Sequence, residues 1–314
     1  MSHTTPGFLA RSRVMRELLK NARRYAAADA NVLITGETGV GKDTMARFLH
    51  AGGPRRRQPF VVVDCPSLAS TLVEAELFGH ERGAFTDATV SRAGRFEAAG
   101  AGTVYLDAVS ALNADAQGAL LRAVEEKRIT RLGGTGAIDI RARILASASA
   151  DIETAVRDGL FRNDLYHRLR VLPLLIPPLR QRPEEILPLA RQFILEIAGG
   201  LKRPPPELTA DAGNALLRHR WPGNIRELRY TIERVLVSGS AERITIADLP
   251  QEVLEEHESY LAPDGPSRPT LDEVERRYIE LTLRHARGSQ TAAARILGIS
   301  RKALWEKRKR YGME

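Results

Sequence analysis

The residues with the clearest chemistry form the run Gly36-Glu37-Thr38-Gly39-Val40-Gly41-Lys42, directly after the strand-like segment 31–35. Three glycines allow consecutive backbone N–H groups to turn toward one polyphosphate, and the lysine reaches its β- and γ-oxygens from the start of the next helix. A strict form of this pattern places Ser or Thr directly after the lysine, but here Asp43 intervenes and Thr44 comes one position later. The run therefore predicts a site for the phosphates of ATP, with the usual hydroxyl ligand of Mg²⁺ displaced.

A site that also hydrolyses ATP needs a group that positions or deprotonates the attacking water. Where an acidic pair is expected, at the end of the strand-like segment 103–107, this chain has Asp107-Ala108. An alanine methyl group can do neither task. The sequence thus predicts a site that holds ATP but has lost the residue that would hydrolyse it.

Basic residues are concentrated near the C-terminal end of the chain. The protein of 314 residues has a formal net charge of +8, and residues 268–314 contain twelve Lys or Arg against six Asp or Glu, which accounts for +6 of it. Such a basic end indicates a contact surface for nucleic acid.

The rest of the composition is that of an ordinary protein of a reducing compartment. Its one cysteine, Cys65, follows the apolar run 60–63, so no disulfide framework is possible within the chain and a packing role is expected. The first residues contain no apolar signal core, and no segment approaches the roughly twenty apolar residues of a membrane span. We therefore expect a cytoplasmic protein.

Strand-like runs alternate with helical segments in the first half of the chain. The runs are 31–35, 60–64, 103–107, 143–147 and 171–176. This rhythm predicts an α/β core around a parallel sheet, with the nucleotide at the carboxyl ends of the strands. After Pro177-Pro178 the pattern is purely helical to about residue 254, and a polar, proline-rich stretch follows. We expect a nucleotide-binding core over 1–177, a helical lid over 178–254, a linker over 255–269 and a DNA-binding domain over 270–314.

The basic end has the spacing of two short helices joined by a tight turn. Residues 289–297 predict one helix, Gly298 closes it in the left-handed conformation, and Ser300 caps a second helix over 301–310. In a helix-turn-helix the first turn of the second helix meets base edges in the major groove. The residues predicted to bind DNA are Ser300, Arg301, Lys302, Trp305, Lys309 and Arg310, the last two through phosphates. The spacing argues against the alternative, a basic tail that merely stays solvated. Because helix-turn-helix units of this type usually read paired half-sites, we expect a dimer through the helix around 271–283.

Five further motifs carry a family resemblance that extends from Phe8 to Met313. They are the segments 76–88 (ELFGHERGAFTDA), 94–97 (GRFE), 161–169 (FRNDLYHRL), 178–183 (PLRQRP) and 221–228 (WPGNIREL). The sequence resembles the AAA+ bacterial enhancer-binding proteins that activate sigma-54 RNA polymerase, and its C-terminal segment resembles the helix-turn-helix found in those activators and in the nucleoid protein Fis. The resemblance implies an AAA+ P-loop core, a small helical lid and an all-α DNA-binding domain.

The signature loop of that family sits at the pore of a ring and touches the sigma factor. Here it is the run Gly83-Ala84-Phe85-Thr86-Asp87-Ala88, in which Phe85 and Thr86 inherit the contact role by resemblance. Asp87 replaces the second glycine of the family's GAFTGA motif. This adds a charge to the loop tip and removes a residue that takes positive φ without cost. The expected contact with sigma-54 is therefore changed.

The resemblance also assigns nucleotide-handling roles. It implies that Lys42 and Asp107 bind the phosphates and Mg²⁺, with Asp107 as the metal ligand, and that Arg226 in the lid senses the nucleotide. Arg162 and Arg168 match the arginines that reach into a neighbouring subunit's site, where a guanidinium group neutralises charge on the transferred phosphoryl group. The family assignment thus implies an oligomeric ring.

Three positions that differ from the family pattern are those that would handle the attacking water. Ala108 stands in place of the family's glutamate, Asp64 in place of an asparagine that holds that glutamate, and Ser149 in place of a sensor asparagine. These changes favour weakened hydrolysis. The alternative is that Asp64, at a nearby strand end, supplies the missing carboxylate and keeps the chain a fully active ATPase.

Two functional classes follow. One is an ATP-driven motor that remodels sigma-54 polymerase, and the other is a DNA-bound, ATP-stabilised regulator that does not turn over; a DNA-repair or replication AAA+ protein is a distant third. A subunit that cannot hydrolyse ATP can still complete a neighbour's site, so a mixed ring with a related subunit is possible alongside a homo-oligomer. About seven residues precede the core, so we expect no receiver or ligand-sensing domain in front of it.

Overall fold

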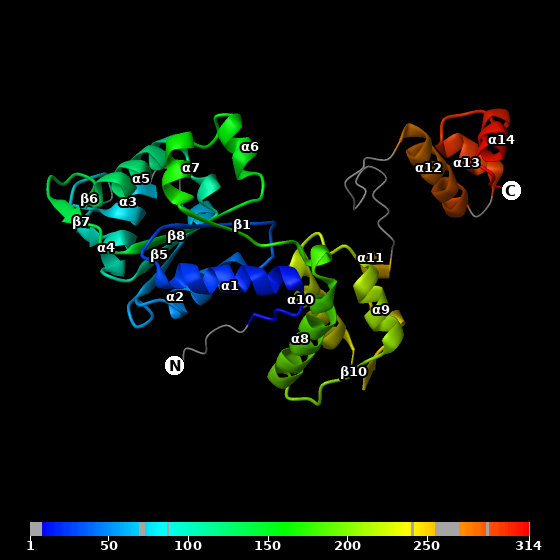
Figure 1. Cartoon of the computed structure of the whole chain (residues 1–314), viewed down its shortest axis with the longest axis horizontal. Helices are drawn as coiled ribbons and strands as arrows, with labels where there is room; N and C mark the ends of the chain where they lie inside the picture. The colour runs from blue at the N-terminus through cyan, green and yellow to red at the C-terminus, as the bar shows by residue number, and fades with distance from the viewer. Residues whose placement is uncertain are drawn as a thin grey trace. The chain divides into compact units, whose positions relative to one another are not determined.

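Five parallel strands form the central sheet of the protein, in the order β2-β5-β8-β1-β9, in the computed structural model (Figure 1). The strands are β1 (Val32–Thr35), β2 (Phe60–Asp64), β5 (Thr103–Asp107), β8 (Arg143–Ala148) and β9 (Leu172–Leu175). The sequence prediction of a parallel α/β sheet is confirmed, and each predicted strand lies within one residue of the observed bounds.

The structure describes residues 8–68, 73–86, 88–239, 242–254, 270–286 and 289–313. The chain divides into two units, Met1–Glu255 and Glu256–Glu314. The predicted linker, 255–269, and Asp87 of the signature loop lie outside the described residues. Among the helices in the described ranges, none is both long enough and apolar enough to cross a membrane.

Helices cover both faces of the sheet because the strand side chains alternate in direction. On one face, α1 (Arg13–Ala27) and α2 (Lys42–Ala51) pack against residues such as Ile34 and Tyr105. On the other face, Leu33 and Leu106 pack against helices of the second layer. These helices are α3 (Val73–Phe78), α4 (Arg95–Ala99), α5 (Ala114–Glu126) and α7 (Asn163–Leu169), with α6 (Ile152–Arg157) before α7.

Two short antiparallel ribbons project from this core. Strands β3 (Gly79–His80) and β4 (Arg92–Ala93) bracket the signature loop, and β6 (Arg128–Thr130) pairs with β7 (Ala137–Asp139). An isolated bridge joins His80 to Leu132, so the two ribbons contact each other. Single 3-10 turns lie at η1 (Cys65–Ser67), η2 (Val109–Ala111), η3 (Leu179–Gln181), η4 (Pro183–Glu185) and η5 (Ile246–Asp248).

The lid that follows β9 has its own apolar core around the fully buried Trp221. Its helices are α8 (Ile186–Gly200), α9 (Ala210–Arg218), α10 (Asn224–Ser238) and α11 (Gln251–Leu254). The prediction of a purely helical lid is wrong in one respect, because β10 (Glu207–Leu208) and β11 (Arg243–Ile244) form a parallel pair. Two residues per strand are too few to show an alternating pattern in the sequence.

The described residues of the C-terminal unit form three helices: α12 (Leu271–His285), α13 (Gln290–Ile296) and α14 (Arg301–Arg310). Its small core is built from Ile279, Ala293, Ala294 and Leu304. The predicted closing glycine, Gly298, has φ 66°, and the predicted cap Ser300 accepts a hydrogen bond from the backbone of Ala303 at 3.1 Å. The helix-turn-helix prediction is confirmed at the level of its helices and caps.

Candidate functional site

The predicted phosphate loop turns between β1 and α2. Gly41 is the N-cap of α2 and has φ 102°, so the loop delivers the backbone N–H groups of the first helical turn to its open side. The Lys42 ammonium donates to the carbonyl oxygens of Gly36 and Glu37 at 2.8 and 3.0 Å. Burial lowers the pKa of Lys42, while the charges of Asp107 and Asp43 oppose this shift. The lysine therefore sits where a triphosphate would meet it.

The lid holds the tip of this loop through polar contacts. Arg180 donates two hydrogen bonds to the Glu37 carboxylate at 2.7 and 2.9 Å, which lowers the pKa of Glu37. The buried Asn224 side chain donates to Glu37 Oε2 and to the Thr38 carbonyl at 3.1 and 3.0 Å. These bonds cross between the loop and the lid, so they hold the tip of the phosphate loop against the lid.

Gly39 lies where the phosphate loop meets the lid, and a larger residue there should weaken the contact between the two. Gly39 has φ +78°, and a Cβ there would lie 2.2 Å from the Gly223 carbonyl oxygen, which is backbone and cannot move aside. We expect Gly39→Ala to lower the free energy of unfolding by at least about 1–2 kcal/mol from backbone strain alone. Urea unfolding measures this. Gly136→Ala is the matched control, since nothing lies within 4 Å of a Cβ there, and equal losses in the two variants would contradict the prediction.

A cavity of about 690 Å³ opens between the phosphate loop and the lid. One end is polar and is lined by the phosphate loop together with Asp107 and Ala108. The rest of the lining mixes polar lid residues such as Gln192 and Arg229 with apolar side chains, namely Phe8, Leu9, Leu189, Phe193 and Ile225. A polar end with backbone donors and further apolar and aromatic lining fit a nucleoside triphosphate.

A network of hydroxyl groups fixes the carboxylate of Asp107. The Tyr105 hydroxyl lies 3.0 Å from Asp107 Oδ1 and 2.9 Å from Asp43 Oδ1, and it donates to one of them at a time. The Ser147 hydroxyl donates to Asp107 Oδ1 at 2.5 Å and accepts from the Ala108 N–H at 2.8 Å. Burial raises the pKa of Tyr105, so this hydroxyl stays protonated. Two acidic side chains are thus held near each other at the polar end of the cavity.

Ala108 contributes to the cavity at the point where the sequence predicts the missing acid. It has left-handed backbone angles, φ 52° and ψ 53°, directly after the end of β5. Asp64 is the register partner of Asp107 in the neighbouring strand β2, so both side chains leave the sheet on the same face. Asp64 itself is exposed and does not line the cavity. Ser149 is also exposed and lies outside the lining, one residue past β8.

A buried ion pair supports the wall of the cavity behind the phosphate loop. Arg182 and Glu185 are each 1% exposed, with Arg182 Nη1 3.3 Å from Glu185 Oε2. Arg182 also donates to the Val40 carbonyl at 3.0 Å, and Ser12, the N-cap of α1, donates to Glu185 Oε1 at 2.9 Å. Burial lowers the pKa of Arg182 and its partner opposes this shift. The pair therefore ties the phosphate loop, α1 and the lid together.

The three arginines predicted from the family lie in different places. Arg226 is exposed at the start of α10 and lines the cavity beside the phosphate loop. Arg162 pairs with Asp164 at 2.8 Å and Arg168 with Glu125 at 2.9 Å, both at the surface and outside the cavity lining. The structure thus brings Arg226 to the chain's own site and leaves the other two at its surface.

The signature loop is closed at its base by backbone hydrogen bonds. Gly83 N–H donates to the Ala88 carbonyl at 2.7 Å, and the Ala88 N–H donates to the Phe85 carbonyl at 2.9 Å. The Phe85 ring packs against His80 with centroids 5.0 Å apart, while Thr86 is exposed. Phe85 is therefore half-buried against its own chain, and Thr86 is left open to a partner.

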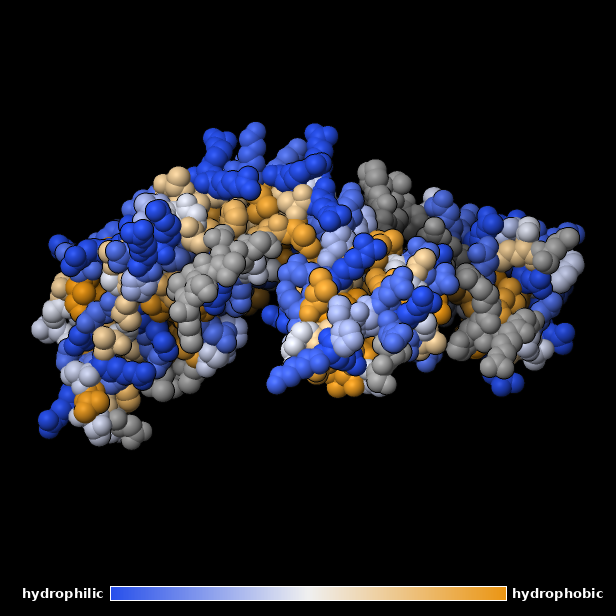
Figure 2. Space-filling model, turned by 90° about the horizontal axis from the view of Figure 1, so that it is seen from below, coloured by the Kyte–Doolittle hydropathy of each residue, from blue (hydrophilic) through white to orange (hydrophobic). Residues whose placement is uncertain are grey.

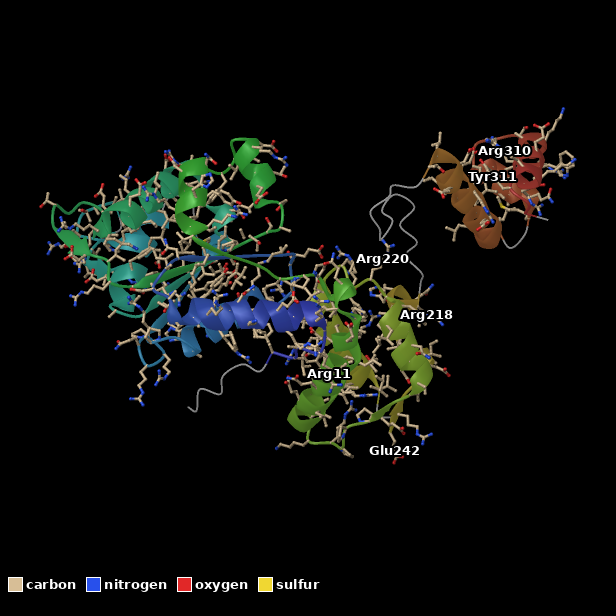
Figure 3. All side chains as sticks on the ribbon, in the orientation of Figure 1. Arg11, Arg218, Arg220, Glu242, Arg310 and Tyr311 are labelled. Carbon is tan, nitrogen blue, oxygen red and sulfur yellow. The ribbon has the colours of Figure 1, made fainter. Side chains whose placement is uncertain are left out.

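The predicted DNA-binding residues follow one side of α14. Arg301, Lys302 and Trp305 are exposed, and the Lys309 ammonium lies 5.4 Å from the centroid of the Trp305 ring. Arg310, labelled in Figure 3, differs from the expectation, because Asp272 of α12 holds its guanidinium at 3.2 Å. The neighbouring Tyr311 hydroxyl donates to Glu275 at 2.6 Å, and this bond raises the pKa of Tyr311 to about 12. Arg308 of the same helix donates to the Met313 carbonyl at 3.0 Å.

The sequence analysis did not identify the residues that hold other site residues in position. Tyr105 and Ser147 position Asp107, Asn224 and Arg180 hold Glu37, and the Arg182–Glu185 pair braces the loop. Tyr105 could have been identified from the sequence, because it lies two residues before Asp107 and residues two apart in a strand point to the same face. The other contacts join segments more than 30 residues apart or lie in an irregular turn, and no local pattern marks them.

Comparison with known protein families divides the chain into three matched segments. Residues 8–175 match the sigma-54 interaction domain, residues 180–264 match the AAA+ ATPase lid domain, and residues 270–311 match the bacterial regulatory proteins of the Fis family. The first match alone covers more than half of the chain.

Curated relatives and solved structures agree with this assignment. The chain is 41% identical to the transcriptional regulatory protein FlbD of Caulobacter vibrioides, across 96% of this chain and 70% of FlbD. It is 36% identical to the DNA-binding transcriptional regulator NtrC of Salmonella typhimurium, across 99% of this chain and 71% of NtrC. The crystal structure of NtrX from Brucella abortus in complex with ATP matches with a TM-score of 0.74 and 30% identity, covering 98% of this chain and 70% of NtrX. The chain belongs to the sigma-54-dependent transcriptional regulators, with a sigma-54 interaction domain, an AAA+ lid and a Fis-type DNA-binding domain.

Proposed function

We propose that this chain is a DNA-bound, ATP-binding regulator of the sigma-54 type in which ATP hydrolysis is weakened. The observation that carries the proposal is the composition of the cavity lining around Ala108. The carboxylates among the described lining residues are Asp43, Asp107 and Glu185, and each already has a hydrogen-bond or ion-pair partner. Position 108 itself presents a methyl group to the cavity, and a methyl group cannot act as a general base on water.

The groups that hold the phosphates are retained. Lys42 and the backbone of the phosphate loop supply positive charge and N–H donors, and Arg226 stands at the edge of the same cavity. The carboxylates of Asp43 and Asp107 and the hydroxyl of Thr44 are oxygen donors of the kind that Mg²⁺ prefers, so the residues present fit that ion. Mg²⁺ would offset the phosphate charge at this end of the cavity.

A fully active ATPase is the second candidate, and one observation favours it. Asp64 is the register partner of Asp107 on the same face of the sheet, one strand away from Ala108. This second candidate assigns the role of the missing glutamate to the Asp64 carboxylate, at the carboxyl end of the strand next to β5. Catalysis would then have moved to a different strand.

Steady-state phosphate release from ATP by the Asp64→Asn variant separates the two candidates. Weakened hydrolysis predicts that the variant keeps the slow rate of the unmodified protein, because Asp64 is not the general base. A relocated base predicts a loss of roughly 10²–10⁴-fold, the usual contribution of general-base catalysis. ATP binding, measured by the fluorescence of a labelled nucleotide, should be the same in both proteins and serves as the control for folding.

Assembly into a ring and contact with sigma-54 polymerase also belong to this proposal. Arg162 and Arg168 are exposed and outside the chain's own cavity, as arginines that serve a neighbour must be. Thr86 offers an exposed contact at the signature loop, next to Asp87 in the sequence. In a ring mixed with a related subunit that keeps the acidic pair, these arginines would complete the ATP site of that neighbouring subunit. Native mass spectrometry of the two co-expressed subunits tests this, and homo-oligomers alone would contradict it.

A further inference from the structure

Helix α1 (Arg13–Ala27) has two unlike faces. Its apolar side packs on the sheet through Met15, Leu18, Leu19, Ala22 and Ala26. Its opposite side is exposed and basic, with Arg13, Arg16, Lys20, Arg23 and Arg24. We call these five residues, with Arg11 just before the helix, the α1 basic face; Arg11 is labelled in Figure 3.

Acidic residues do not balance this face. Glu17 is the one acidic residue in the α1 sequence, and it pairs with Arg13 at 3.2 Å. Asp29, just beyond the helix, is held by Arg55 at 2.8 Å. Within the described part of the chain, Arg16, Lys20, Arg23 and Arg24 take part in no ion pair or side-chain hydrogen bond. Four cations are therefore available to an outside partner.

The loop after α2 extends the basic surface. This loop packs against the last turn of α1 so closely that a Cβ at Gly53 would lie 2.7 Å from the Ala26 carbonyl oxygen. Arg56 and Arg57 in the same loop are exposed. Figure 2 shows hydrophilic side chains projecting along the edge of the molecule over the stretch that α1 occupies in Figure 1. The surface is thus an extended row of charge.

The spacing of this row fits a polyanion. Arg16, Lys20 and Arg23 are four and three residues apart, which places successive side chains about 4.5–6 Å apart along the helix axis. Duplex DNA presents one negative charge about every 1.7 Å of its axis, so a row of cations can contact several phosphates at once. A single small phosphate group would use one or two of these side chains and leave the others unmatched.

We propose that the α1 basic face is a second DNA-binding surface, which contacts the duplex backbone without reading its sequence. The inference rests on the proposed DNA-binding function, since the Fis-type unit at the other end of the chain recruits the duplex. Once that unit is bound, neighbouring DNA is at high effective concentration for the rest of the same chain. Phosphate contacts of this kind add affinity and salt dependence but no specificity.

The test compares two triple variants of the full-length chain by fluorescence anisotropy with a labelled random-sequence duplex. The first is Arg16→Gln, Lys20→Gln, Arg23→Gln. The control is Arg191→Gln, Lys202→Gln, Arg218→Gln, which removes three exposed lid cations that form no ion pair within the described residues; Arg218 is labelled in Figure 3. We expect the α1 variant to bind about tenfold or more weakly, and its slope of log affinity against log salt to fall by about 2–3, since each lost phosphate contact contributes roughly 0.9. The lid variant should stay close to the unmodified protein.

The outcomes separate this inference from the proposed function. If the α1 variant and a variant with Arg301→Gln and Lys302→Gln each bind the duplex more weakly than the unmodified protein, while the lid variant does not, both surfaces contact DNA and the inference stands. If the unmodified protein binds and the α1 variant binds equally well, the inference is overturned while DNA binding remains. Equal losses in the α1 and lid variants would show a general effect of net charge and would also overturn it. If neither the unmodified protein nor any of these variants binds the duplex, the proposed DNA-binding function itself is wrong.

Discussion

Replacing Ala108 with glutamate should raise the rate of ATP hydrolysis by roughly 10²–10⁴-fold. Ala108 lines the cavity at its polar end, directly after Asp107, so a longer side chain there enters the space beside the phosphate loop. A carboxylate at that point can accept a proton from water, which the methyl group cannot. Steady-state phosphate release at saturating ATP measures the effect.

Ala108→Gln is the matched control for this substitution. Glutamine has nearly the size and shape of glutamate but is not a base, so its rate should stay at that of the unmodified protein. Both variants place a long side chain at a left-handed backbone position, φ 52°, so any cost of strain is shared. An unchanged rate in Ala108→Glu, with ATP still bound, would refute the view that one missing carboxylate limits hydrolysis.

Removing Glu185 should destabilise the first unit by about 3–5 kcal/mol. Without it, the guanidinium of Arg182 would stay buried with no opposite charge, and Ser12 would lose its acceptor at the start of α1. Urea unfolding of Glu185→Ala, followed by the fluorescence of the buried Trp221, measures the change. A Trp305→Phe background leaves Trp221 as the remaining one of the chain's two tryptophans.

Glu184→Ala is the control for this prediction. Glu184 is the preceding residue and is exposed, so its removal should change stability by no more than about 0.5 kcal/mol. A loss below about 1 kcal/mol in Glu185→Ala would mean that the buried pair contributes little, as happens when a buried ion pair is offset by its desolvation cost.

The sequence predicts the sheet well because its signals are local. Each of the five strands is a short apolar run bounded by polar or turn residues, and the structure places each within one residue of the prediction. The caps of the C-terminal helices depend on residues next to each other, such as Gly298 and Ser300, and these are confirmed. The strands β10 and β11 were missed because each is two residues long and carries one apolar side chain.

The candidate site was predicted only in part, because its local signals are visible in the sequence and its long-range contacts are not. The phosphate loop is contiguous, so its residue types are visible in the sequence. The contacts that shape it are not, because Glu37 meets Arg180 and Asn224 across more than 140 residues. The intramolecular partner of Arg310 could not be read from the sequence, since Asp272 is brought to it by packing of α12 near α14. The catalytic roles given to Asp64, Arg162, Arg168 and Arg226 stay predictions.

The proposed function requires that the pocket holds ATP and cleaves it only slowly. The most direct measurement is to incubate the purified chain with ATP and Mg²⁺, separate it from free nucleotide, and identify the nucleotide released on denaturation. We expect to recover intact ATP from the unmodified chain after an incubation in which Ala108→Glu yields ADP. Recovery of ADP from the unmodified chain, at the same rate as from Ala108→Glu, would refute weakened hydrolysis and leave the active ATPase as the better description.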